Sequence, residues 1–318
     1  MTKSNPNNRI AAIDMGTNSF HLVIVEIKKD GSFRFLDRER EVIRLGTQQG
    51  KDLSFISDEE TGRAVKIMTS FVKLAKYYKA QIRAISTSAV REAKNQKEFI
   101  HTIFKKTGVA VEVVDGKTEA ELDFLGIKTA ISIDRNKVLC IDIGGGSTEF
   151  IFAENGKIIY AESVKVGAVR LSKLFFPNYI LSAEAINNAN QYVVEQIMNN
   201  KNILTNIDID FSIGVSGTIN TIYSLSQFKK FGKIKEPING YSFFKEEFQE
   251  YFNTITMLKS SEERLLVPGI DAKRSDIIPA GMIILMKIFE LFNIKKMVIS
   301  EYSLREGIVV DTLGKMTN

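Results

Sequence analysis

The sequence predicts an α/β protein with two lobes, and three observations support this fold class. The chain has 318 residues, whereas a single hydrophobic core rarely grows beyond about 250 residues. Short apolar runs alternate with segments whose apolar residues recur at helical spacing, which is typical of α/β proteins. A strand-turn-strand pattern near the N-terminus recurs in the second half of the chain. We therefore expect one lobe over residues 1–130 and a second over residues 131–318.

The first lobe opens with two apolar strands joined by a polar turn. Residues 9–27 form this pattern, and the apolar run is interrupted only at residues 14–19. A capping box at residues 57–60 predicts a helix over residues 58–79, and a second box at residues 118–121 predicts a helix toward residue 130, with Thr118 as its cap. The intervening segments are predicted as a strand at 81–86, a polar connection at 87–91, a helix at 96–107 and a strand at 109–114.

The second lobe begins with the same strand-turn-strand layout, at residues 138–153. A tight loop at residues 215–218 then opens a helix through residue 225. Residues 228–239 contain four lysines between Lys229 and Lys235 and are predicted as a surface loop. The other predicted elements are helices at 182–200, 242–258 and 276–292, strands at 208–214 and 296–300, and a closing helix at 304–313 that could pack back on the first lobe.

Composition excludes several classes of function. Hydrophobic residues make up 44% and charged residues 25%, as in soluble globular proteins. The polar residues 1–9 lack an apolar signal region, and no uncharged apolar run approaches the roughly 18 residues of a membrane span, so we expect a cytoplasmic protein. One cysteine, Cys140, and two histidines cannot form a disulfide or a Cys/His zinc cluster. The net charge of +5 is more compatible with an anionic than a cationic partner.

The two strand-turn-strand segments are internal copies that match at a constant offset of 128 positions, Asp14 with Asp142 and Gly16 with Gly144 among them. Glycine lets backbone amides approach phosphate oxygens closely, and neighbouring hydroxyl groups add donors. The alternative interpretation of each of these segments is a flexible hairpin with polar flanks. We predict that both turns bind phosphate, through Gly16, Thr17, Asn18 and Ser19 in the first copy and Gly144, Gly145, Gly146, Ser147 and Thr148 in the second.

Carboxylates flank both turns. Asp14, Asp142 and Glu149 would repel a bound phosphate unless a hard cation lay between them. Mg²⁺ takes one or two carboxylates together with phosphate oxygens, so these three residues are the candidate metal ligands. The alternative is that the aspartates only bond the backbone of their own turns.

Five motifs follow one another along the chain: AIDMGTNSFH at 12–21, STSAVREA at 86–93, IDIGGGSTE at 141–149, GVSGT at 214–218 and LREG at 304–307. Together they resemble the exopolyphosphatase and guanosine pentaphosphate phosphatase family over about residues 10–313. The resemblance implies the fold of the actin, sugar kinase and heat-shock chaperone ATPases. That fold has two ribonuclease-H-like lobes, with mixed sheets flanked by helices, around an interlobe phosphate-binding cleft.

The resemblance also implies roles for individual residues. Glu119, in the setting Gly116-Lys-Thr-Glu-Ala120, positions the attacking water, and Asp142 and Glu149 complete the catalytic group. Without the resemblance, Glu119 reads as the acidic start of a helix, where the helix dipole favours an ionised carboxylate. Further phosphate contacts are implied for Ser88, Arg91, Ser216, Gly217, Thr218 and Arg274.

The expected function is hydrolysis of the terminal phosphoanhydride of short inorganic polyphosphate. The expected cofactor is Mg²⁺, and whether a monovalent cation is also needed stays open. Hydrolysis of guanosine pentaphosphate is the alternative function. Two further alternatives are an ATP-dependent kinase and a non-catalytic protein that binds guanosine tetraphosphate. A kinase would need an adenosine pocket, and Pro268-Gly269 lacks the paired-glycine turn that commonly marks it. We expect a homodimer with no DNA or membrane partner. The substrate preference and the roles of His21 and the lysine segment stay open.

Overall fold

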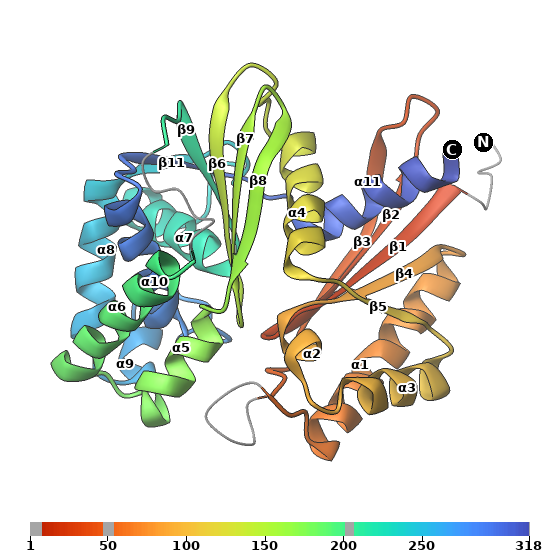
Figure 1. The fold of residues 1–318 in the computed structure, drawn as a ribbon, viewed down its shortest axis with the longest axis horizontal. Coiled ribbons are helices and arrows are strands. Elements are labelled where there is room, and N and C mark those ends of the chain that lie inside the picture. Colours follow the sequence, from red (N-terminus) through yellow and green to blue (C-terminus); the bar gives the residue numbers. More distant parts are fainter. Residues whose placement is uncertain (1–7, 47–53, 201–206, 318) are drawn as a thin grey trace. The chain divides into compact units, whose positions relative to one another are not determined.

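The computed structural model describes residues 8–46, 54–200 and 207–317. The polar segment at residues 1–9, used above against a signal peptide, lies almost wholly outside them. The chain divides into two compact units. Figure 1 labels the helices and strands of both. Unit 1 comprises residues 1–126 and 304–318, and unit 2 comprises residues 127–303. The last helix of the chain therefore belongs to unit 1, and the division falls close to the expected residue 130.

Unit 1 contains a five-stranded mixed sheet in the order β3-β2-β1-β4-β5. Its strands are β1 (Arg9–Met15), β2 (Ser19–Ile27), β3 (Phe33–Val42), β4 (Gln81–Ser86) and β5 (Val111–Val113). One face packs against α1 (Asp58–Tyr77), α2 (Ser88–Glu92) and α3 (Gln96–Thr107), and the other against α11 (Leu304–Thr317). Both faces of β1 are buried, because Ala11 and Ile13 contact the first group of helices while Ile10 and Ala12 contact the second.

Unit 2 contains a six-stranded mixed sheet in the order β10-β11-β9-β6-β7-β8. The strands are β6 (Lys137–Ile143), β7 (Thr148–Glu154), β8 (Lys157–Val164), β9 (Phe211–Val215), β10 (Ser242–Phe244) and β11 (Lys296–Ile299). The helices are α5 (Ala168–Phe175), α6 (Ala183–Met198), α7 (Gly217–Phe231), α8 (Lys245–Met257), α9 (Ser261–Leu265) and α10 (Ile278–Leu291), with a 3₁₀ turn η2 (Pro177–Tyr179). Helix α4 (Gly116–Ala130) runs from one unit into the other.

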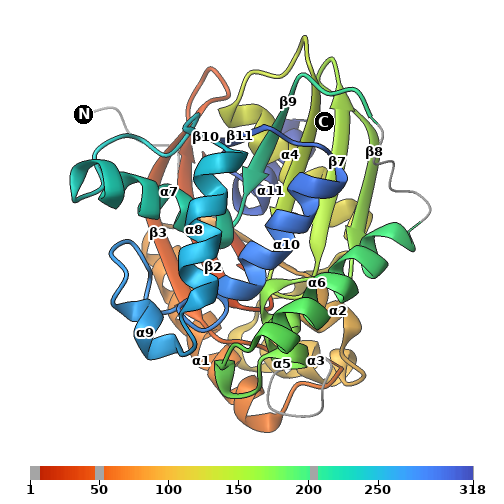
Figure 2. The same cartoon turned by 90° about the vertical axis from the view of Figure 1, so that its left-hand side faces the viewer.

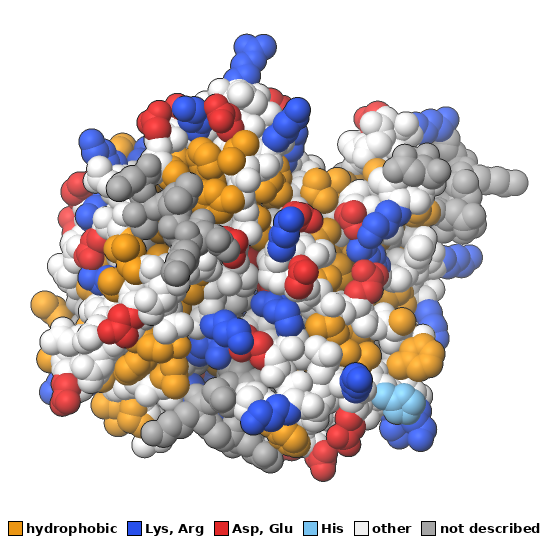
Figure 3. Space-filling model, viewed as in Figure 1, with side chains coloured by type: hydrophobic (Ala, Val, Ile, Leu, Met, Phe, Trp, Pro, Cys, Tyr) orange, Lys and Arg blue, Asp and Glu red, His pale blue; other side chains and the backbone are white. Residues whose placement is uncertain are grey.

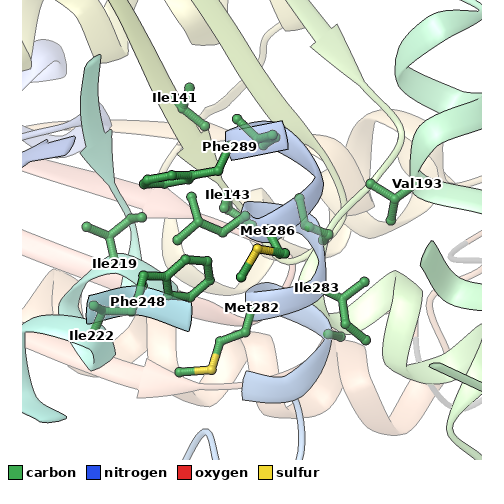
Figure 4. Close-up of a cluster of buried hydrophobic side chains, with 14 of the residues drawn as sticks. Ile141, Ile143, Val193, Ile219, Ile222, Phe248, Met282, Ile283, Met286 and Phe289 are labelled. Atoms are coloured by element: carbon green, nitrogen blue, oxygen red, sulfur yellow. The ribbon is translucent and has the colours of Figure 1, made fainter. Parts of the chain in front are cut away.

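Helix α10 is the centre of the unit 2 core. Eleven of its fourteen residues are buried, and it contacts α5, α6, α7, α8 and β6; Figure 2 shows it between α8 and α6. In Figure 4 its side chains Met286 and Phe289 lie among Ile141 of β6 and Phe248 of α8. Even this helix has only 14 residues, and no helix within the described ranges is long and apolar enough to cross a membrane.

The internal repeat predicted from the sequence is present in both sheets. Strands β1 and β2 pair with Asp14 opposite His21, and β6 and β7 pair with Asp142 opposite Glu149. Each hairpin continues into a third antiparallel strand, and the first strand of each hairpin pairs in parallel with a later strand, β4 or β9. The prediction of two mixed sheets flanked by helices is confirmed.

The start of α4 differs from the prediction. The helix begins at Gly116 rather than after Thr118, and the amide of Thr118 donates to the Asp115 carboxylate at 2.7 Å. This hydrogen bond holds the pKa of Asp115 below its ordinary value. The capping box assigned to residues 118–121 is therefore wrong, because an acceptor three residues earlier already satisfies the first turn. The capping box of Ser57 and Glu60 is confirmed.

The segment at residues 242–258 was predicted as one helix, but its first three residues form strand β10. Phe243 pairs with Met297 of β11 and is fully buried. Tertiary burial of this aromatic ring outweighs the helical pattern of the residues that follow it. The predicted lysine loop is also shorter than expected, because α7 continues to Phe231.

Two glycines in α11 give a matched test of how the last helix packs in unit 1. A Cβ atom at Gly307 would lie 1.8 Å from the carbonyl oxygen of Leu122 in α4, whereas a Cβ at Gly314 would meet nothing within 4 Å. We expect Gly307→Ala to lower the free energy of unfolding by about 3 kcal/mol through overpacking. Gly314→Ala is expected to raise it by about 0.5 kcal/mol, because alanine favours the helix. Urea unfolding followed by circular dichroism measures both, and equal effects of the two changes would contradict this packing.

Candidate active site

The turn between β6 and β7 is a tight four-residue loop that is tied to the start of α5. The amide of Gly144 donates to the carbonyl of Ser147 at 2.9 Å. The glycine carbonyls accept from the beginning of α5. These bonds run from the amide of Ala168 to Gly144, from the amides of Val169 and Arg170 to Gly145, and from Nε of Arg170 to Gly146 at 2.7 Å. All three glycine carbonyls are thus used by one helix.

The amides of the same turn have no such partners. Within the part of the chain that the structure describes, the amides of Gly145, Gly146 and Ser147 donate to no protein acceptor. Successive backbone amides of this kind form an anion-binding nest. The turn therefore offers backbone donors suited to a phosphate, and the phosphate contacts assigned to it stay a prediction. The Thr148 hydroxyl takes another role and donates to the carbonyl of Val166 at 2.6 Å.

Gly167, the residue before α5, was missed by the sequence reasoning. A Cβ atom at this position would lie 2.4 Å from the carbonyl oxygen of Gly145 and 2.6 Å from the carbonyl carbon of Gly146. Only glycine allows α5 to approach the turn this closely. A glycine immediately before a helix was the available signal, but the residue it contacts lies 22 positions away along the chain and cannot be read from local sequence.

The turn between β1 and β2 in unit 1 has the same construction. The amide of Gly16 donates to the carbonyl of Ser19 at 3.2 Å, and the carbonyls of Thr17 and Asn18 accept from the segment after β3. Thr17, Asn18 and Ser19 are all buried. Oδ1 of Asn18 has no hydrogen-bond partner among the described residues, while its Nδ2 donates to Oγ of Ser19 at 3.2 Å. A buried unpaired acceptor is costly, so this oxygen is suited to accept a hydrogen bond from a donor such as water rather than to contact a phosphate oxygen.

The predicted metal ligands are divided between the units. Glu149 is buried beside Asp142 in unit 2, and Oγ of Ser163 donates to its Oε1 at 2.7 Å. Asp14 occupies the matching position in unit 1, beside His21, whose Nδ1 lies 3.4 Å from Nη1 of Arg305. Among the described residues no group of three or more His, Cys, Asp or Glu side chains is arranged to hold a metal. The two carboxylates of unit 2 fit Mg²⁺, which completes its shell with water and phosphate oxygens, whereas unit 1 offers one carboxylate, Asp14, beside a histidine.

Glu119 and Arg91 form a buried ion pair in unit 1. Nη1 of Arg91 donates to Oε2 of Glu119 at 2.6 Å and to the carbonyl of Val114 at 3.1 Å. The Glu119 side chain is 9% exposed and that of Arg91 21%. Burial raises the pKa of the Glu119 carboxyl above its ordinary value, although Arg91 and a hydrogen bond from Thr87 oppose the rise. The structure therefore places two predicted site residues in direct contact.

Two other residues on α2 and α4 bear on this pair: Ser88 has another partner than predicted, and Asp123 was not among the predicted site residues. Ser88, predicted to contact phosphate, donates its hydroxyl to Oε1 of Glu92 at 2.9 Å. Asp123 is 1% exposed and lies one helical turn after Glu119 on α4, so that both carboxylates share a face of the helix. The i, i+4 spacing of the two acids was a readable signal that the sequence reasoning did not use.

The loop before α7 and Arg274 come together in unit 2. Ser216 adopts φ 114°, a strained conformation for a residue with a side chain, and its Oγ accepts from the amide of Thr218 at 3.2 Å. A Cβ at Gly217 would lie 1.6 Å from Cζ of Arg274, so the guanidinium group rests directly on this glycine. A strained loop with an arginine against its backbone is a candidate anion site, and the phosphate contacts assigned to these residues stay predictions.

Two of the four lysines in the lysine segment are paired with carboxylates of α8. Lys229 pairs with Glu250, and Lys230 lies 3.3 Å from Oε1 of Glu247. On the face shown in Figure 3, Lys and Arg side chains are interspersed with Asp and Glu. Between α7 and α8 there is also a cavity of about 270 Å³, lined by Leu225, Phe228, Lys229, Glu250, Tyr251, Thr254, Ile255, Val267 and Pro268.

Comparison with known proteins identifies the family. The model of the Ppx/GppA phosphatase family matches residues 23–316, which is most of the chain. The chain belongs to the Ppx/GppA phosphatase family. This Ppx/GppA chain is 30% identical over 313 residues to the bifunctional 3-dehydroquinate synthase/phosphatase of Fusobacterium nucleatum. It is 28% identical over 314 residues to the guanosine-5'-triphosphate,3'-diphosphate pyrophosphatase of Photobacterium profundum.

The alignments cover 95% and 96% of the Ppx/GppA chain but only 46% and 59% of these two relatives. The chain thus spans about half the length of these two relatives. Among solved structures, an exopolyphosphatase from Cytophaga hutchinsonii superposes with a TM-score of 0.88 at 29% identity, and the match covers 96% of this chain and 98% of that one. The family resemblance predicted from the five motifs is confirmed.

Proposed function

We propose that this Ppx/GppA chain hydrolyses terminal phosphoanhydride bonds of inorganic polyphosphate and releases orthophosphate. The observation that carries the proposal is the buried Glu119 carboxylate held by Arg91 at 2.6 Å. A carboxylate in this setting can accept a hydrogen bond from a water molecule and orient it for attack. The similarity to the Cytophaga hutchinsonii exopolyphosphatase supports this choice of substrate.

In the proposed reaction the protein supplies position and charge rather than a covalent intermediate. Glu119 orients the water, and the guanidinium of Arg91, also in unit 1, offsets the negative charge of the phosphoryl group. In unit 2, the amides of Gly145 and Gly146 are candidate donors to phosphate oxygens. Asp142 and Glu149 would hold Mg²⁺ in unit 2, and Asp14 is the matching carboxylate of unit 1. When bound, Mg²⁺ supplies further positive charge to the phosphate oxygens.

Phosphate release measures the proposal directly. The purified chain is incubated with short polyphosphate, long polyphosphate, guanosine pentaphosphate or ATP, in Mg²⁺ or in EDTA, and orthophosphate is measured with malachite green. We expect release from short polyphosphate in Mg²⁺ and loss of release in EDTA. Absence of release from every substrate would contradict the proposal, and so would transfer of phosphate from ATP to an acceptor other than water.

Guanosine pentaphosphate is the second candidate substrate, and the cavity beside α7 favours it. The cavity has an apolar lining with one carboxylate and one ammonium group at Glu250 and Lys229, which suits a planar base with polar edges. Phe228 lies about 16 Å along α7 from Gly217 at 1.5 Å per residue, so a phosphate bound at the start of the helix leaves the nucleoside end free to extend along it.

Filling the cavity separates the two substrates. Thr254 lines the cavity from the exposed side of α8, and Thr254→Trp would occupy the space. We expect the KM for guanosine pentaphosphate to rise on the order of tenfold while the KM for short polyphosphate stays unchanged. Asn253→Trp, at the exposed neighbouring position outside the cavity, is the matched control. If both substrates respond alike to Thr254→Trp, the cavity does not bind the nucleoside.

A further inference from the structure

Arg264 in α9 is a charged residue with no exposed surface. It is 0% exposed and is among the largest fully buried side chains of the described residues. Its guanidinium donates to three backbone carbonyls, from Nε to Ser275 at 2.6 Å, from Nη1 to Leu258 at 3.0 Å and from Nη2 to Tyr179 at 2.9 Å. These carbonyls belong to three separate segments of unit 2. Arg264 therefore joins segments that no strand or helix connects.

This arrangement needs arginine rather than any other cation. Burying a charge is unfavourable unless its donors are satisfied, and no carboxylate of the described chain lies within ion-pair distance of Arg264. A planar guanidinium can donate in three fixed directions at once, whereas an ammonium group is a compact point charge on a flexible stem. Arginine is therefore the residue type suited to hold three carbonyl groups at fixed positions relative to one another.

One of the three carbonyls belongs to the residue that follows Arg274. The Arg274 backbone is itself held by hydrogen bonds. Its amide donates to the carbonyl of Asp271, and its carbonyl accepts from the amides of Ile277 and Ile278 at the start of α10. The Arg274 guanidinium rests on Gly217 of the loop before α7. The peptide between Arg274 and Ser275 is therefore fixed at the point from which the Arg274 side chain reaches that loop.

We propose that Arg264 is a positioning residue for phosphate binding: by holding the Ser275 carbonyl, it keeps the Arg274 guanidinium over Gly217. This inference rests on the proposed function together with the prediction that Arg274 contacts the phosphates of the substrate. The competing interpretation is that Arg264 only stabilises the fold around α9. The two interpretations differ in whether the effect of Arg264 on activity requires Arg274.

A double-mutant cycle with Arg274 tests the proposal. Arg264→Lys and Arg264→Gln are made alone and combined with Arg274→Ala, and kcat and KM are measured for tripolyphosphate alongside thermal unfolding. We expect each Arg264 variant to lower kcat/KM by up to about 10²-fold, the size expected when a site group is misplaced by about 1 Å. In the Arg274→Ala background the same changes should leave kcat/KM within twofold, while still lowering the melting temperature.

Arg83→Lys serves as a stability-matched control. Arg83 is a largely buried arginine of unit 1 that bonds Glu112, Asp311 and Thr312, so its substitution should lower the melting temperature with kcat/KM unchanged. Multiplicative losses in the Arg274→Ala background, or an Arg264 variant that melts earlier but keeps parental kcat/KM, would overturn the proposal. If only one of Arg264→Lys and Arg264→Gln remains folded at the assay temperature, that variant alone is used to test the proposal.

A second readout separates this proposal from the proposed function. The affinity for tripolyphosphate is measured by calorimetry in the same cycle, without following hydrolysis. If the parent chain binds tripolyphosphate but releases no phosphate, the proposed function fails while the affinities still test Arg264. Loss of affinity on Arg264→Lys only when Arg274 is present supports the positioning role, and equal loss in both backgrounds rejects it.

Discussion

Replacing Glu119 by glutamine is expected to lower turnover by about 10² to 10⁴-fold, the usual contribution of a positioned acid or base. Glutamine keeps the shape of the side chain and can still accept a hydrogen bond from Arg91. It lacks the negative charge that orients a water molecule for attack. Steady-state phosphate release from tripolyphosphate measures the loss, and calorimetry with the same anion checks that binding is retained.

Glu121 provides a matched control for this change. It lies two residues later on the same helix and is exposed, so Glu121→Gln should leave turnover unchanged. Glu119→Gln leaves Arg91 without its partner charge, so the melting temperature should fall, but less than in a variant that strands the more deeply buried carboxylate, because the Arg91 side chain is 21% exposed and reaches solvent. Near-parental turnover with Glu119→Gln would remove Glu119 from its proposed role.

The second large effect is expected for Arg91→Met. The change leaves the Glu119 carboxylate buried without its cation, which typically destabilises a protein by about 3 kcal/mol or more. Arg91 lowers the pKa of Glu119 against the effect of burial, so its removal should raise that pKa further. Because Glu119 must be ionised to act, turnover falls as the pH drops through its pKa, and the acid limb of the pH profile should shift to higher pH.

Retention of the cation and neutralisation of its partner make this prediction specific. Arg91→Lys keeps a positive charge and should leave the acid limb closer to its parental position than Arg91→Met does. In the double variant Arg91→Met, Glu119→Gln no unpaired carboxylate remains, so unfolding in urea should show less destabilisation than Arg91→Met alone. An acid limb that does not move in Arg91→Met would show that another group controls it.

Much of the site could be predicted from local sequence because the turns are local structures. Asp14 and Asp142 end apolar strands, and the glycines that follow them allow the tight bend, so both hairpins and their register could be inferred from short segments. The Ser57 capping box was readable for the same reason. Predictions failed where a distant partner intervened, as at residues 242–244, which pair with β11.

The sequence by itself determined the family, the duplicated glycine turns and the candidate catalytic carboxylate, Glu119. Only the tertiary structure decided which groups surround them. Arg91 meets Glu119 across 28 positions of the chain, and Arg264 meets the carbonyl of Tyr179 across 85. Contacts of this kind depend on how helices pack on the sheets, and neither spacing nor residue type specifies them. Local patterns encode local geometry, whereas burial and charge pairing arise only when distant segments are packed together.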